Sequence, residues 1–314
     1  MTEYYETTPN VTEQSEENRV VNKALTPLPT PHLTGLKLKA DISINGLVLN
    51  TIDENNVVWV VTEIDGWWNL PESELPDLPR GYADGSYDAV GRFSNRILSL
   101  NGSFLPQNPA DAPAARDALI QAITLVKTGG WLLVDEGTVR GAYVRLSGTP
   151  LITSVNARGR HDFSIGLKAV DPTKYEYIDG NPDGYDYADI ASGGSVTVTN
   201  GGNIAVPIVL GVTGGLTGVS PASPALIYTG STPNTDPTIK IIATVTSAET
   251  LEIDTYNREV LAVEGTSVLN ARSRVSVLVD WIYLEPGTTT VRFVDPSAGT
   301  SASCRIYWRS GWIG

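Results

Sequence analysis

The chain has 314 residues, a formal net charge of −13 and a single cysteine, Cys304. Its length allows two units that each bury a core, whereas the charge and the lack of any Lys/Arg cluster exclude a surface built to bind nucleic-acid phosphates. No run approaches the ~20 apolar residues that span a bilayer, and a lone cysteine forms no intrachain disulfide. Abundant Val, Ile, Thr and Gly favour short strands joined by tight turns, and so a mainly β protein.

The N-terminal segment, residues 1–22, is polar and acidic. A segment with so few apolar groups cannot offset its ordering entropy, so we expect a flexible acidic arm that orders only against a neighbour. It lacks the basic and then apolar order of a secretion signal. Residues 23–174 are predicted to form a β-rich unit. In it, apolar and polar residues alternate up to Ile44, and Asn45-Gly46 follows; because a type I′ turn needs positive φ at both central positions, this pair predicts a β-hairpin.

A long loop follows, from Asp65 to Gly91. It carries adjacent tryptophans and several prolines, and a loop of this length inside a compact unit is usually functional. Aromatic side chains dominate the energetics of protein interfaces. The sequence therefore predicts contact with a partner through the aromatic residues Trp67, Trp68, Tyr82 and Tyr87. The alternative for the same aromatics is a platform on which a sugar stacks.

One helix is predicted, at residues 109–127, because its apolar residues recur at helical spacing. Asp111 is the expected N-cap, and Gly129-Gly130 ends the helix. A strand with one buried face follows at residues 163–169, and Pro172 stops it by removing a backbone donor. The chain divides at this point.

Residues 175–194 are crowded with Asp, Gly and Tyr and show no apolar period, so the sequence predicts a linker. Asp179-Gly180-Asn181-Pro182-Asp183-Gly184 matches the first half of a calcium-binding loop, which makes a calcium-dependent adhesin the weakest of three readings. The bidentate carboxylate expected at the twelfth position falls on Ile190. We therefore expect a solvated linker, without a metal.

Residues 195–314 show short apolar-alternating runs separated by turn residues, which predicts a β-sandwich. Trp281 and Trp308 share strand faces with apolar neighbours and are expected in its core. Trp312, near the end of the sequence, is the candidate for an exposed interface position.

No catalytic signature is present. The two histidines, His32 and His161, lie in different segments, and no glycine-rich phosphate loop or G-x-S-x-G pattern occurs. Cys304 shares a strand face with Ile306 and Trp308, so it is predicted to be a buried, inert thiol. We expect no enzyme, no cofactor and no metal ion.

Three passages together resemble the distal tail proteins of long-tailed bacteriophages, and more narrowly the actinobacterial phage branch. These are Asp65-Gly66-Trp67-Trp68 with its loop to Gly91-Arg92, the strand that ends in Asp171-Pro172, and the C-terminal run from Glu249-Thr250-Leu251 through Glu285-Pro286-Gly287 to Trp308-Arg309-Ser310-Gly311-Trp312-Ile313. The similarity extends from about residue 35 to the end and leaves out the acidic arm.

The resemblance implies an N-terminal belt domain, a split β-barrel with one helix, that assembles into a hexameric ring. It also implies a galectin-like or carbohydrate-module-like sandwich on the outside of that ring. Members of the family join the tail tube to the tail-tip hub, and DNA only passes through the lumen; the tape measure protein is a further expected partner. We would then expect a virion protein at the distal end of the tail, assembled in the host cytoplasm and not inserted in a membrane. The rival function is an adhesion module that binds a host-surface glycan.

Overall fold

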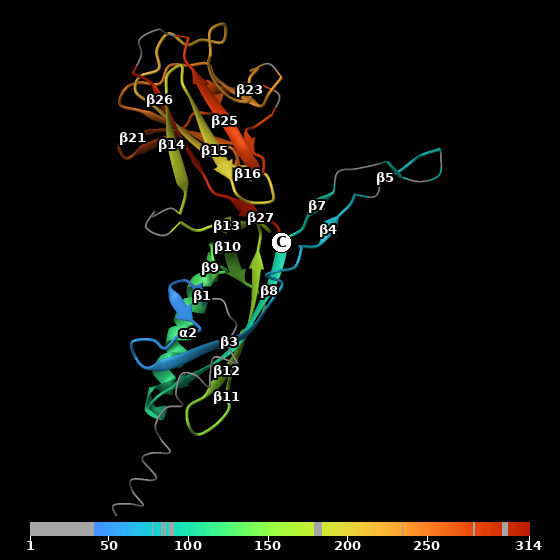
Figure 1. Cartoon of the computed structure of the whole chain (residues 1–314), viewed down its shortest axis with the longest axis vertical. Coiled ribbons are helices and arrows are strands. Elements are labelled where there is room, and N and C mark those ends of the chain that lie inside the picture. The colour runs from blue at the N-terminus through green and yellow to red at the C-terminus, as the bar shows by residue number, and fades with distance from the viewer. Residues whose placement is uncertain are drawn as a thin grey trace, which may run out of the picture.

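The computed structural model describes residues 41–314 except 77, 83, 85, 88–90, 179–183, 234, 279 and 297–300. The protein is mainly β, as predicted, and forms two lobes that lie one above the other in Figure 1. Each lobe has its own hydrophobic core, one drawn from residues 42–169 and the other from residues 190–308. The predicted acidic arm and the calcium-like Asp179–Asp183 run lie outside the described residues.

The lower lobe is built on one curled, antiparallel sheet. Its path runs β2 (Leu47–Leu49), β1 (Asp41–Ile44), β9 (Gly130–Asp135), β10 (Val139–Leu146), β12 (His161–Ala169), β8 (Arg96–Pro106) and β3 (Val57–Asp65), with β11 (Leu151–Ser154) beside β12. In β8 and β12 every second side chain is buried, which is the two-residue period of a strand with one face on a core. Asn45 and Gly46, both at positive φ, form the predicted turn between β1 and β2.

The two ends of this path approach each other and make a nearly closed barrel. The backbone N–H of Trp59 donates to the carbonyl of Thr51, just after β2. The N–H of Val61 donates to the side-chain oxygen of Asn50, which is buried and at positive φ. The edge of β3 is therefore partly satisfied by side-chain and loop groups in place of a neighbouring strand.

The predicted helix is present as α2 (Ala112–Val126), preceded by the single 3₁₀ turn η2 (Pro109–Asp111). Its buried stripe packs into the barrel core and consists of Ala115, Leu119, Ala122, Ile123 and Val126. Asp111 occupies the predicted N-cap position of α2, but without the side-chain bond expected of a cap. Asn108 caps the chain instead, through Ala110 N–H, because the 3₁₀ turn moves the start of the helical region upstream.

The upper lobe is a sandwich of two antiparallel sheets with three short accessory elements. One sheet has the order β14 (Asp186–Ala191), β26 (Ser303–Trp308), β17 (Val209–Thr213), β20 (Thr250–Asp254), β21 (Glu259–Glu264) and β22 (Ser267–Asn270). The other has the order β15 (Ser195–Asn200), β25 (Gly287–Val294), β18 (Ala225–Thr229), β19 (Thr238–Ile241) and β23 (Val275–Leu278). Short elements β16 (Val206–Pro207), β24 (Tyr283–Leu284) and η3 (Arg272–Arg274) complete it. Trp281, Trp308 and Cys304 are buried in its core, as predicted, and burial raises the pKa of the Cys304 thiol to about 12.

The segment expected to be a linker contains regular structure, which corrects that expectation. Within residues 175–194, β14 pairs with β26 along six residues and is the edge strand of the sandwich. Ile190 is buried at the core face, and Asp189 on the outer face holds Arg305 through two hydrogen bonds. The short alternation of Ala188 and Ile190 with polar residues is the strand signal, and it is diluted by the acidic residues around it.

The end of the chain leaves the sandwich and joins the lower lobe. β13 (Lys174–Glu176) pairs with β10 on one side and with β27 (Gly311–Trp312) on the other. Residues from both ends of the second half of the sequence thus lie at the junction of the lobes, beside the point marked C in Figure 1.

Candidate assembly interface

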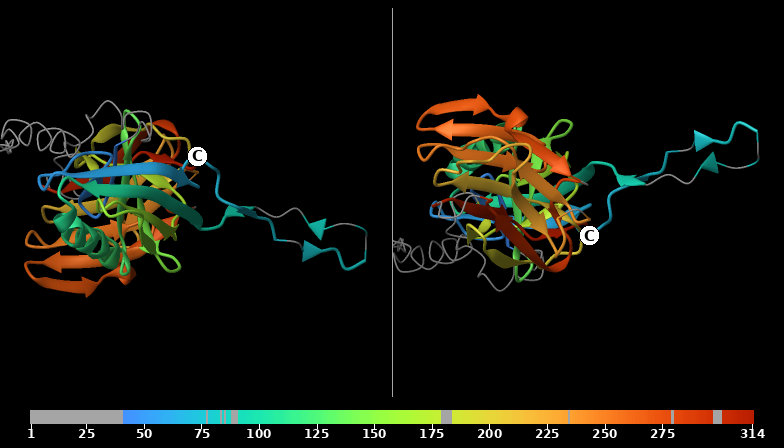
Figure 2. Two further views of the ribbon diagram at one scale, coloured as in Figure 1. Left: turned by 90° about the horizontal axis from the view of Figure 1, so that it is seen from below. Right: turned by 90° about the horizontal axis from the view of Figure 1, so that it is seen from above.

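A long hairpin projects from the lower lobe, and we call residues 69–93 the projecting hairpin. It is held by two short strand pairs, β4 (Ser73–Glu74) with β7 (Arg92–Phe93) and β5 (Leu78–Pro79) with β6 (Ser86–Tyr87). In Figures 1 and 2 it extends away from both lobes in all three views. A two-stranded ribbon of this kind is marginally stable by itself in water.

The projecting hairpin exposes large apolar side chains. Leu70 is 65% exposed, Leu75 is 71% exposed and Tyr82 is fully exposed. Its sequence has five acids and two arginines, so it is also acidic. Exposed apolar side chains rimmed by charge mark a surface that a partner covers.

The aromatic residues predicted to contact a partner separate into two groups. Tyr82 lies at the far part of the hairpin and Trp68 is half exposed at its base, both open to a partner. Trp67 is completely buried in the barrel core, so its side chain is not an interface element and that part of the prediction was wrong. The side chain of Tyr87 lies outside the described part of the structure.

The base of the hairpin is anchored on Glu136, just beyond β9. Its carboxylate accepts hydrogen bonds from the indole N–H of both Trp67 and Trp68, and it also pairs with Arg140 at 3.1 Å. Gly66 turns the chain at φ 78°, where a side chain would collide with the carbonyl of Ile97. The hairpin therefore leaves the barrel from a fixed root.

A buried arginine ties this root to the junction of the lobes. The Arg96 guanidinium donates to the carbonyls of Gly66, Trp67 and Asn69 at 2.7–3.2 Å, to that of Pro172 at 2.9 Å, and to that of Ile313. Burial lowers the pKa of Arg96. Carbonyl dipoles from the hairpin root, the seam after β12 and the far end of the chain thus replace the water that this cation has lost.

Lys174, at the start of β13, supports the same root. It is completely buried, and its ammonium donates to the carbonyl of Trp67 at 3.0 Å and lies 5.0 Å from the Trp67 ring. Burial lowers the pKa of Lys174 to about 8, although Glu136 acts in the opposite direction.

Stability should therefore increase with pH in the alkaline range. Between pH 8 and the ordinary lysine value of 10.5 the unfolded chain binds the Lys174 proton more tightly than the folded chain does, so the free energy of unfolding rises by at most ~1.4 kcal/mol per pH unit. Lys174→Met keeps the stem but does not titrate. Urea unfolding of both proteins from pH 7 to pH 10 should show a rise in the original chain relative to the variant, and parallel curves would contradict the assignment.

Trp312, the other predicted interface residue, is used within the chain. Its strand β27 pairs with β13, and its ring stacks on the Arg140 guanidinium at 4.2 Å. Because Arg140 also binds Glu136, the terminal tryptophan, the junction and the hairpin root form one connected set of contacts.

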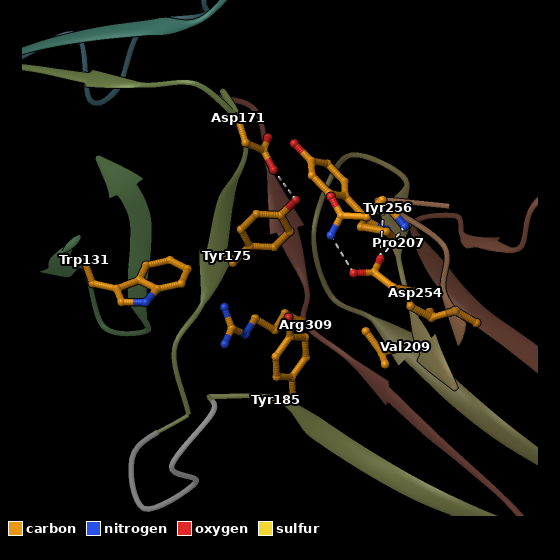
Figure 3. A pocket seen from close by; sticks show the side chains of 11 residues that line it. Trp131, Asp171, Tyr175, Tyr185, Pro207, Val209, Asp254, Tyr256 and Arg309 are labelled. Carbon is orange, nitrogen blue, oxygen red and sulfur yellow. Dashed lines mark hydrogen bonds between the residues drawn. The ribbon is translucent and has the colours of Figure 1, made fainter. Parts of the chain in front are cut away.

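A cavity of about 210 Å³ lies between the lobes, as Figure 3 shows. Arg309 lies in it, 3.9 Å from the ring of Tyr185 and 5.0 Å from that of Trp131. The Tyr175 hydroxyl donates to Asp171, and both burial and this carboxylate raise the pKa of Tyr175. Asp254 accepts hydrogen bonds from Tyr256 and Asn257. These polar groups bond to one another, which suits a packed joint between lobes.

Sequence reasoning missed the two buried cations. Arg96 stands in phase with Leu98 and Leu100, at the inward positions of β8, and a charged residue in that register is the signal that could have found it. Lys174 follows the Asp171-Pro172 stop, where no period exists to show that its side chain turns inward.

Within the described residues, no group of three or more His, Cys, Asp or Glu side chains is arranged to hold a metal ion. Across that same part of the chain, no helix has the length and apolar character needed to cross a bilayer.

Comparison with known proteins gives a family for the second lobe. Residues 218–312 match the family model described as "Siphovirus-type tail component, C-terminal domain". The chain is a phage tail protein with a siphovirus-type C-terminal domain. A search of curated proteins finds no match to it.

The fold of this tail protein resembles that of the Dit protein (gp 19.1) of phage SPP1, whose crystal structure is described as a paradigm of the hub adsorption apparatus in phages infecting Gram-positive bacteria. The TM-score is 0.55 at 14% identity, over 87% of this chain and 99% of that chain. Two structures of the phage P2 baseplate in its activated conformation, with calcium or with strontium, match at a TM-score of 0.44 and 11% or 14% identity, over 86% of this chain and 98% or 97% of those chains. Only the first similarity bears on the fold, and it extends over both lobes.

Proposed function

We propose that this tail protein is a structural ring subunit at the distal end of the tail, with no catalytic role. The ring is closed, most simply of six copies, and is built by the lower lobe. The sandwich then forms its outer wall. The observation that carries the proposal is the projecting hairpin, whose apolar side chains its own chain leaves uncovered.

The contacts at the junction support a rigid subunit of this kind. Arg96, Lys174 and Glu136 fix the root of the hairpin against both lobes, so the hairpin has a defined direction when it meets a neighbour. A preformed contact element loses less entropy on binding than a free loop does. Head-to-tail contacts between identical copies close into a ring when the rotation between neighbours permits.

The neighbours we propose are the tail tube on one side of the ring and the tail-tip hub on the other, with the tape measure protein as a further contact during assembly in the host. DNA would pass through the lumen without specific binding. The net charge of −13 suits that role, since like charge repels the phosphate backbone.

Electron microscopy of intact tails tests this proposal. We expect a single ring of this protein with sixfold symmetry between tube and tip. The ring need not persist in dilute solution, so the tail is the decisive sample. A ring of another symmetry, or a location away from the distal end, would contradict the proposal.

Glycan binding by the sandwich is the second candidate, and one observation favours testing it. The cavity between the lobes combines aromatic rings with carboxylates, which is the general composition of sugar sites. We expect the full chain to show no specific binding on a glycan array, because the polar groups of the cavity already bond to one another. Specific binding that is lost in Tyr256→Ala, at the exposed rim, would establish a receptor-binding role.

A further inference from the structure

A second surface on the lower lobe matches the projecting hairpin in character. It lies on the outer face of strands β8, β10 and β12 and consists of Ile97, Tyr143, Arg145, Lys168 and Val170. We call these five residues the outer patch.

The sheet register places these residues together. Arg145 of β10 is paired with Lys168 of β12, and Lys168 is paired with Ile97 of β8, so the three form a row across the sheet. Val144 is paired with Ala169, so Tyr143 of β10 and Val170, the residue directly after β12, follow that pair on the outward side. Ile97 is 58% exposed, Val170 63% and Tyr143 47%. The outer patch therefore combines three exposed apolar side chains with two adjacent cations.

The charges of Arg145 and Lys168 are not neutralised by any described residue of the same chain. Among the described residues Arg145 and Lys168 form no ion pair, unlike Arg92, Arg140 and Arg305. Two positive side chains on neighbouring strands repel each other, which destabilises the sheet unless an anionic partner lies close to them. The projecting hairpin offers acids of this kind beside exposed Leu75 and Tyr82, and in Figures 1 and 2 it points away from its own lobe.

We propose that the projecting hairpin of one copy docks on the outer patch of the next copy. This inference rests on the proposed ring and names the contact that would build it. Charge complementarity selects the pair, with Asp84 at the tip of the hairpin facing Arg145 and Lys168 on the patch, while the neighbouring Tyr82 covers Ile97 and Val170.

Because the outer patch lies close to the hairpin of its own copy, the same contact forms again between each copy and the next. β8 begins three residues after Phe93, the last residue of the hairpin, so the outer patch of each copy lies beside the root of its own hairpin. A copy that receives a hairpin on its patch therefore presents its own hairpin from the adjacent position. The contact is head-to-tail, as a ring requires.

Charge reversal on the two surfaces tests the docking. Sedimentation of the full chain up to about millimolar concentration should show self-association that weakens with salt, because exposed charges are screened. Arg145→Glu with Lys168→Glu should weaken it by about tenfold or more, since like charges then face each other. Mixing this variant with a second one, Asp84→Lys, should restore association between the two proteins. Arg158→Glu, an exposed charge away from the patch, is the matched control and should change nothing.

Chemical cross-linking tests which residues lie close together in the docked pair. A copy carrying Tyr82→Cys mixed with a copy carrying Val170→Cys should be joined by a short bismaleimide, and the buried Cys304 should not react. Absence of self-association, equal association in every variant, or no cross-link would overturn the docking and assign the hairpin to another tail protein. The images of intact tails decide the ring separately: a ring whose hairpins avoid the outer patch would overturn this inference alone, and a tail without the ring would overturn the proposed function.

Discussion

Replacing Arg96 with methionine is expected to reduce the free energy of unfolding by roughly 3–5 kcal/mol, because breaking a buried ionic network leaves groups without partners. The variant removes donors to five carbonyls from three distant parts of the chain, all buried or partly buried. Methionine fills much of the volume but cannot donate. Urea unfolding followed by tryptophan fluorescence measures the loss.

Arg92→Met provides the control within the same region. Arg92 is on the hairpin, largely exposed, and among the described residues its ion-pair partner is Glu74 at the surface. Exposed pairs are worth ~0–1 kcal/mol, so this variant should be nearly as stable as the original. Equal losses for Arg92→Met and Arg96→Met would show that the carbonyl network does not hold the junction.

Trp67→Ala is expected to destabilise the protein by about 3–5 kcal/mol, as truncation of a large buried aromatic generally does. The ring is completely buried in the barrel core, and its loss leaves a cavity beside Lys174. The hairpin root should loosen as well, because the variant loses the indole N–H bond to Glu136 and the ring contact with Lys174, although the backbone carbonyl that accepts from Arg96 and Lys174 remains. Limited proteolysis should then cut near residue 68 before the lobes unfold.

Trp68→Ala is the matched control for Trp67→Ala. Trp68→Ala removes a ring of the same size that donates to the same carboxylate but is 50% exposed. We expect it to cost under ~1 kcal/mol in stability and to affect assembly with a partner more than folding. If both variants lost the same stability, the burial difference between the two tryptophans would not govern the site.

Much of the fold could be predicted because the relevant signals are local. Alternation in β8 and β12, the Asn45-Gly46 turn and the apolar stripe of α2 each depend on a few consecutive residues. The junction could not be predicted, because it depends on pairs that are far apart in sequence. Lys174 binds the carbonyl of Trp67, and β27 pairs with β13, but no sequence pattern in any one of these segments indicates its partner. The same holds for Trp67 and Trp68, whose different exposure follows from where the loop meets the barrel.

The bond from Arg96 to the carbonyl of Ile313 has a consequence for the order of folding. These residues are 217 positions apart, so the guanidinium cannot find its last acceptor until the ribosome has made the entire sandwich. Contacts of such long range form late. During synthesis the barrel would therefore carry a hairpin root that is not yet locked, and a nascent copy would be slow to engage its neighbours. Coupling the root to a distant residue delays subunit association until each chain holds both of its lobes.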